Sequence, residues 1–280
     1  MYLHGDHRIH HMIGSDERNQ LMRQGWLVVP EVVPRVLCES VIGAIEAFLN
    51  IRSDDPATWY EHPPSGHGIV PLHHSQAQWN VRQYPAIHEV FADLYNTKEL
   101  WVSMDRVAFK PPVSGWESEV GIDAFHWDGD PTSEEFSLQG LVYLRDTPPE
   151  LGGFSCLPDI YSRLDDWLHL NDPKSLRSSS VNFPKKVIGA PAGSLVIWHR
   201  RMPHSSSLNL GLVPRWVQYV TMDYSEAAGV QRHQRTRDFI ERRPPAWAIR
   251  QNVVGQQVPE PGPNVELTSL GRKLVGIDDW

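Results

Sequence analysis

A histidine and a carboxylate stand two positions apart in the segment "FHWD", residues 125–128, with a large aromatic side chain before and between them. Residues i and i+2 of an extended chain project to the same face, so His126 and Asp128 can bind one object together while Phe125 and Trp127 face elsewhere. Imidazole and carboxylate are common metal ligands. The alternative is a hydrogen-bonded core histidine, because H-x-D occurs by chance in many chains.

A third ligand candidate follows 76 residues after Asp128, where His204 stands just past the predicted strand "SLVIWHR". Two histidines and one carboxylate on one side of a metal, with three positions open, form the facial triad of non-haem iron(II) oxygenases. A fourth protein ligand would leave too little room for a cosubstrate and dioxygen, and thiolates would favour zinc or copper. These residues therefore predict an iron(II) site.

Arg215, eleven residues after His204, begins the predicted strand "RWVQYV". Its guanidinium can form a bidentate, charge-assisted pair with a carboxylate, which a dicarboxylate keto acid bound to the iron would supply. The alternative is a surface salt-bridge residue.

The elements that must position these residues are mainly β. From about 99 to 225, short β-rich runs alternate with Pro, Gly, Asp and Ser at a spacing typical of a sandwich or barrel. We expect one domain over 1–280, with a flexible lead-in at 1–14, a jelly-roll core at 99–225 and a C-terminal extension at 226–280 packed on the core. Helical patterns cover 15–24, 34–50 and 84–95, a strand follows at 26–29, and after 95 the helices stop until a possible one near 267–274.

Composition limits the class of protein and its partners. A chain of 280 residues with 40% hydrophobic and 21% charged residues is an ordinary globular protein. Its net charge of −8 weighs against nucleic acid, and the basic stretch 232–243 is interrupted by acids, as on a solvated helix face. No apolar run or signal core predicts a membrane partner, so we expect a cytoplasmic protein. Cys38 and Cys156 have no disulfide or zinc spacing and are expected to be reduced and buried.

The chain resembles the phytanoyl-CoA dioxygenase (PhyH)-like family of Fe(II)/2-oxoglutarate-dependent oxygenases over nearly all its length. The matching segments are "LMRQGWLVVPEVV", "FKPPVSG" leading to "FHWDGD", "LVYLRDTPPELGGFSCLP", "AGSLVIWHRRMPHSSSLNLGLVPR" and "LTSLGRKLVGIDDW". The combination is specific, although each piece alone is not. Where the family usually has P-G-S-H after a Gly-Gly step, this chain reads "LPDIYSR", so the influence of the loop after Gly153 on substrate choice stays open.

The resemblance implies a double-stranded β-helix, that is, a cupin-like jelly roll with flanking helices. It implies Fe(II) bound by His126, Asp128 and His204, with 2-oxoglutarate and O2 as cosubstrates. Arg215 would bind the distal carboxylate of 2-oxoglutarate, and Ser206 matches a family position whose hydroxyl assists that arginine.

Strand alternation adds three candidates for cosubstrate binding. Arg106 shares a face with Lys110 in "MDRVAFK", and Gln139 shares a face with Tyr143 in "LQGLVY". Arg106, Gln139 and Tyr143 could therefore line the cosubstrate cavity, with Lys110 near the site. A solvent-facing position is the alternative for each.

Other aromatic and polar side chains are expected to be structural. Trp127 is expected in the wall or core, and His199 differs in strand phase from Trp198. His73 and His74 are expected to be surface histidines, with the mouth of the site as the alternative.

The expected reaction is hydroxylation or a related oxidation of a small-molecule metabolite, such as a natural-product intermediate, with release of succinate and CO2. Halogenation is not expected, because Asp128 is present where carboxylate-lacking relatives open a halide position. The segments expected at the rim of the site hold acids and no Lys or Arg, so we expect a free molecule without a coenzyme A or nucleotide carrier. The alternatives are a cupin-type metal-dependent isomerase or hydrolase and a catalytically silent binding protein.

Overall fold

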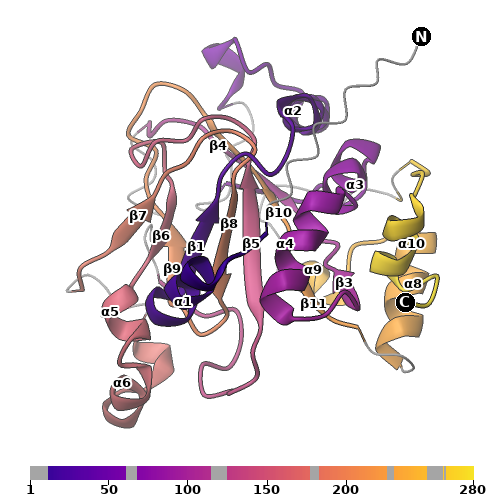
Figure 1. Ribbon diagram of the computed structural model, residues 1–280. Coiled ribbons are helices and arrows are strands. Elements are labelled where there is room, and N and C mark those ends of the chain that lie inside the picture. The colour runs from indigo at the N-terminus through magenta and orange to yellow at the C-terminus, as the bar shows by residue number, and fades with distance from the viewer. Residues whose placement is uncertain are drawn as a thin grey trace.

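The computed structural model describes residues 12–60, 68–114, 125–176, 183–225, 230–250, 261 and 263–280. A six-stranded antiparallel sheet lies at its centre, and a three-stranded sheet lies on one side of it (Figure 1). The central order is β1 (Trp26–Val29), β8 (Leu195–His199), β5 (Leu138–Tyr143), β10 (Arg215–Tyr219), β4 (Val107–Lys110) and β2 (Ile69–Val70). The smaller sheet has the order β7 (Lys186–Ile188), β6 (Phe154–Cys156) and β9 (His204–Ser206).

Strand alternation gives the central sheet two buried faces. One face packs on the helices through Val107, Phe109, Leu195, Ile197 and Trp216. The other face packs on the smaller sheet, where Ala108, Leu141, Tyr143, Val196 and Val217 meet Phe154, Cys156 and Ile188. The fold is therefore the predicted jelly roll, and the space between its two sheets is where inward-facing polar residues can meet.

Helices cover the other side of the central sheet (Figure 1). The N-terminal ones are α1 (Ser15–Gln24), α2 (Arg35–Leu49), α3 (Gln76–Arg82) and α4 (Pro85–Tyr95), and the C-terminal ones are α8 (Val230–Ile240), α9 (Ala246–Arg250) and α10 (Ser269–Val275). The structure also contains a two-stranded sheet, β3 (Leu100–Val102) with β11 (Met222–Tyr224), and the 3₁₀ turns 56–58 and 173–175. The predicted end of α1 is confirmed, since Gly25 adopts the left-handed conformation with φ 77°.

The structure differs from the sequence prediction inside the core segment. Two helices, α5 (Pro158–Tyr161) and α6 (Leu164–Leu170), lie where none was expected. Leu164, Trp167 and Leu168 have the i, i+3, i+4 spacing of a helical face, and they pack in a small cluster with Phe125 and Leu157. The central sheet also takes in β1 and β2, which precede residue 99. The flexible lead-in expected at 1–14 falls almost entirely outside the described residues.

The basic face of α8 is not simply solvated as expected. The Arg235 guanidinium lies 4.8 Å from the Trp101 ring centroid and donates hydrogen bonds to the carbonyls of Val102, Leu274 and Val275. Arg235 therefore ties α8 to β3 and α10. The cysteines are as expected: both thiols are free and buried, and burial raises the pKa of Cys38 to about 11 and of Cys156 to about 12.

Gly193, just before β8, predicts a large effect of a single methyl group. Its φ is 82°, and an added Cβ would lie 2.1 Å from the carbonyl oxygen of Val33. Gly193→Ala should therefore lower the free energy of unfolding by at least about 2 kcal/mol, as measured by urea denaturation. Gly43→Ala in α2 is the control, because no atom lies within 4 Å of its added Cβ. That change should be neutral or stabilise by up to about 1 kcal/mol, and equal effects of the two changes would contradict the steric role of Gly193.

Candidate active site

The three predicted metal ligands converge at the start of β9. The His204 N–H donates to the His126 carbonyl at 3.0 Å, and the His126 N–H donates to the His204 carbonyl at 3.1 Å. Asp128 Oδ1 lies 3.6 Å from His126 Nε2, and Asp128 Oδ2 lies 3.3 Å from His204 Nε2. One ligand atom from each residue lies within 4.8 Å of the others. The structure thus brings together all three residues that the sequence singled out.

Neighbouring groups hold these ligands in the state that a metal ion requires. His204 Nδ1 lies 3.0 Å from the Met202 carbonyl, which can only accept, so Nδ1 carries the hydrogen and Nε2 is free to coordinate. Burial would raise the pKa of the Asp128 carboxyl, but His126 and His204 outweigh it and hold that pKa well below its usual range. Two imidazole nitrogens and an ionised carboxylate fit Fe(II), with positions left open.

Gln139 orients the carboxylate of Asp128. Its Nε2 donates to Asp128 Oδ2 at 2.6 Å, and its Oε1 accepts from Trp198 Nε1 at 3.1 Å. The Trp198 ring also packs 5.1 Å from the His204 ring, centroid to centroid. Strand alternation predicted Gln139 near the cosubstrate; its side-chain hydrogen bonds here go to Asp128 and Trp198, and the cosubstrate contact stays a prediction.

Two buried cations lie side by side farther along the same space. Arg215 pairs with Lys110 across β10 and β4, and their side chains are almost completely buried. Arg215 Nη1 donates to the Gly152 carbonyl at 2.8 Å, and Lys110 Nζ donates to Ser206 Oγ at 3.1 Å. Ser206 and His204 share a face of β9, so the cations and the predicted metal ligands lie on the same side of that strand. Two neighbouring positive side chains give this region a positive potential, which suits an anionic group.

The remaining predicted site residues take different places. The Ser206 hydroxyl, expected to assist Arg215, has its recorded hydrogen bond with Lys110. The Tyr143 hydroxyl donates to the Ile188 carbonyl and accepts from the Phe154 N–H, both at 2.7 Å, and so links the central sheet to the smaller one. Arg106 is buried, with Nε 3.3 Å from Asp105 Oδ1.

Two residues near the site were not singled out from the sequence. Burial raises the pKa of the Tyr219 hydroxyl. The positive charge of Arg215 lowers this pKa, and the negative charge of Asp128 raises it. The signal was present, because Tyr219 shares strand parity with Arg215 on β10. Trp247 lies 5.0 Å, ring centroid to Cζ, beneath the Arg106 guanidinium, and no periodicity in the C-terminal extension marks it.

His73 and His74 are buried, so their predicted surface position is wrong. His73 Nδ1 lies 3.1 Å from the Met104 carbonyl, and His74 Nε2 lies 3.1 Å from the Arg243 carbonyl. Burial lowers the pKa of His73 to about 3 and that of His74 to about 4. The helices and the chain after α8 cover both imidazoles, which local sequence patterns do not reveal.

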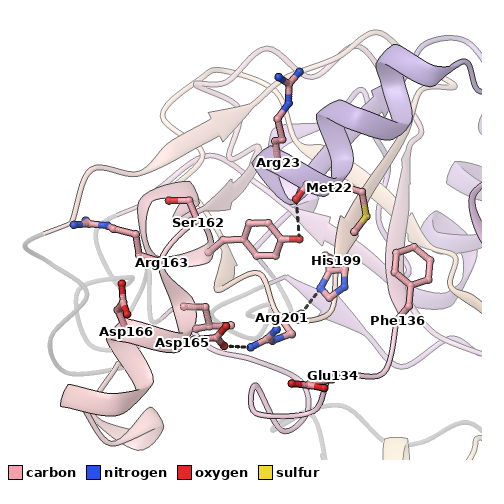
Figure 2. A pocket seen from close by; sticks show the side chains of 12 residues that line it. Met22, Arg23, Glu134, Phe136, Ser162, Arg163, Asp165, Asp166, His199 and Arg201 are labelled. Atoms are coloured by element: carbon pink, nitrogen blue, oxygen red, sulfur yellow. Dashed lines mark hydrogen bonds and ion pairs between the residues drawn. The ribbon is translucent and has the colours of Figure 1, made fainter.

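A cavity of about 680 Å³ lies beside α6 and the end of β8, away from the predicted metal ligands (Figure 2). It is lined by Arg201, His199, Tyr161, Phe136 and Asp165 among others, and by none of the three ligand residues. His199 is structural, as expected, with its Nδ1 accepting from the Arg201 N–H at 3.1 Å. Trp127 packs against the small core cluster of Phe125 and Leu157, its ring contacts Trp167, and its Nε1 donates to the Arg201 carbonyl at 2.8 Å.

Comparison with known proteins gives consistent matches. The family described as phytanoyl-CoA dioxygenase (PhyH) matches residues 21–217. A putative phytanoyl-CoA dioxygenase of Dictyostelium discoideum is 23% identical over 78% of this chain and 78% of its own length. The Ava biosynthesis cluster protein O of Aspergillus versicolor is 23% identical over 74% of this chain and 77% of its own length.

Solved structures share the fold. The non-haem α-ketoglutarate-dependent epimerase SnoN from nogalamycin biosynthesis superposes with a TM-score of 0.54 at 16% identity, covering 89% of this chain and 94% of its own. Among the described residues, no helix has both the length and the apolar character to cross a bilayer.

The buried His73 predicts a specific acid sensitivity. The unfolded chain takes up a proton on this imidazole below about pH 6.5, whereas the folded protein does so only near pH 3. The contribution of His73 to stability is therefore complete above pH 6.5. It falls as the pH drops towards 3, by up to about 1.4 kcal/mol per pH unit.

Replacing His73 with Gln should flatten the decrease in the free energy of unfolding between pH 6.5 and 4, measured by urea denaturation at each pH. His233→Gln, at an exposed position of α8, is the control and should keep the wild-type slope. An unchanged slope in His73→Gln would show that this imidazole does not titrate as described.

Proposed function

The chain belongs to the phytanoyl-CoA dioxygenase family of non-haem iron, 2-oxoglutarate-dependent oxygenases, and we propose that it hydroxylates or otherwise oxidises a small-molecule metabolite. The reaction releases succinate and CO2. One observation carries the proposal: His126, Asp128 and His204 converge at the start of β9, and Ser206 of the same strand contacts Lys110, which pairs with Arg215. Family membership disfavours a cupin-type isomerase or hydrolase and a silent binding protein.

In this proposal His126, Asp128 and His204 hold the iron. Bound there, iron with O2 and 2-oxoglutarate supplies the oxidising power that no side chain has. The protein's own contribution is to position the ligand side chains and the cosubstrate and to exclude water from the site. The Met202 carbonyl fixes the orientation of His204, and the Gln139 amide fixes that of Asp128.

Arg215, Lys110 and Ser206 bind the distal carboxylate of 2-oxoglutarate in this arrangement. The close approach of the two cations supports it, because guanidinium and ammonium groups form charge-assisted hydrogen bonds with carboxylates. Tyr143 shapes the wall of the cavity by linking the sheets, and Arg106 lines it near Trp247.

The substrate proposed is a free small molecule such as a natural-product intermediate. The Aspergillus relative and SnoN both carry biosynthetic descriptions. Arg82 and Lys110, which could have supplied positive charge for a coenzyme A group, are buried and donate to backbone carbonyls. Arg200, however, is exposed beside Gly129, so one cation lies near the predicted rim. Whether the substrate carries a coenzyme A group therefore needs a direct comparison of free and coenzyme A-linked compounds.

We also propose that the chain is one domain, because elements before and after 99–225 pack in the same core. A cytoplasmic location and the absence of a nucleic-acid partner stay predictions from composition and charge.

If three side chains hold the iron, removing one histidine should prevent iron binding. His126→Ala should abolish both Fe(II) binding, measured by anaerobic titration, and 2-oxoglutarate turnover, measured as succinate. His233→Ala, at an exposed position, should leave both unchanged. Full turnover in His126→Ala would contradict the assignment. Affinity alone does not identify iron, because copper and zinc usually bind such ligands more tightly.

The buried cation pair predicts the affinity for the cosubstrate. Arg215→Ala should weaken 2-oxoglutarate binding about tenfold or more, since a charge-assisted hydrogen bond contributes roughly 1.5 to 3 kcal/mol. Calorimetric titration in the presence of a redox-inert metal measures this. Arg23→Ala, exposed on α1, is the control. Wild-type affinity in Arg215→Ala would assign this arginine to structure alone.

The proposed substrate class predicts a preference for uncharged or weakly charged free molecules. A panel of matched acids, offered free and as coenzyme A thioesters, should show 2-oxoglutarate consumption mainly with the free compounds. A clear preference for the thioesters would overturn this part of the proposal and leave the enzyme class intact.

A further inference from the structure

The turn between β8 and β9, residues 200–203, contacts both chain segments that carry metal-ligand candidates. The Met202 carbonyl lies 3.0 Å from His204 Nδ1, which fixes the ring of one ligand. The Arg201 carbonyl accepts a 2.8 Å hydrogen bond from Trp127 Nε1, next to Asp128 in sequence. The same short turn thus contacts both His204 and the segment that carries Asp128.

The Arg201 side chain adds a second link to the segment that carries Asp128. Its Nε donates to the Pro131 carbonyl at 2.9 Å, and its Nη2 pairs with Asp165 Oδ1 on α6 (Figure 2). Trp127 and Pro131 flank the loop 128–130, so Arg201 holds this loop at both ends. The Arg201 side chain is 21% exposed, whereas the Asp165 side chain is 86% exposed. The buried part of the arrangement is therefore the part that faces the loop.

Asp128 needs such support more than its fellow ligand. The side chain of Asp128 is 36% exposed, whereas that of His204 is 9% exposed and packed against aromatic rings. The position of a partly exposed carboxylate is fixed by its backbone and by hydrogen bonds more than by packing. Groups that orient ligands from outside the coordination sphere typically change metal affinity by about 10- to 100-fold.

We propose that Arg201 is a positioning residue of the metal site, which fixes the 127–131 segment, and with it the Asp128 carboxylate, against the turn that orients His204. The inference rests on the metal site proposed above. In this proposal the Arg201–Asp165 ion pair, which lines the cavity beside α6, holds the Arg201 side chain in place.

The test compares Arg201→Gln with Arg163→Gln. Arg163 is exposed, lines the same cavity, and makes a recorded contact with the Asp159 carbonyl at 3.4 Å. Co(II) is titrated into the metal-free full chain well below its unfolding temperature, and both the affinity and the ligand-field absorption bands are recorded. Arg201→Gln should bind Co(II) about 10- to 100-fold more weakly, with shifted bands. Arg163→Gln should match the wild type, and Arg201→Lys should lie between, because an ammonium cannot replace both donors at once.

The outcomes separate this inference from the metal site itself. Wild-type affinity and bands in a folded Arg201→Gln overturn the positioning role. Should that variant not fold, Arg201→Lys takes its place, because it keeps the positive charge but cannot make both side-chain contacts. A several-fold loss of affinity then supports the role, and no loss overturns it. A wild-type chain that binds no Co(II) overturns the proposed metal site, and the inference with it.

Discussion

The reciprocal backbone hydrogen bonds between His126 and His204 are the contact on which the site depends. They join two segments 78 residues apart in the sequence, at 3.0 and 3.1 Å. Directly opposed residues of an antiparallel pair project to the same side, and the two imidazole rings accordingly lie 4.8 Å apart between centroids. Asp128, two positions after His126, returns to that side. One local pairing thus gathers three ligand groups.

Aromatic and charged side chains lie close together beyond this contact. Trp198 packs on His204 and Phe154 and also donates to Gln139. A single indole therefore supports both arms of the ligand set. Arg215 and Lys110 lie on the central sheet where the smaller sheet covers them.

The sequence predicts best what strand alternation determines. A strand buried on a defined face has a fixed register, which is why the burial of Arg106, Lys110 and Tyr143 is consistent with parity alone. The partners of those side chains do not follow from it. Tyr143 bonds to two backbone groups of the smaller sheet, and Ser206 bonds to Lys110, because the separation of the two sheets sets those distances. The burial of His73 likewise depends on the helices that cover it.

Because its ligand residues come from distant parts of the jelly roll, the unfolded chain contains no preformed metal site. An ion that binds only the closed structure lowers the free energy of that state alone and raises the apparent stability with its concentration. The His126–His204 pairing also spans a long loop, and such non-local contacts form late and slowly. Metal supply would then govern more than turnover. In a cell short of iron, the same chain would open more often and persist for less time before proteolysis.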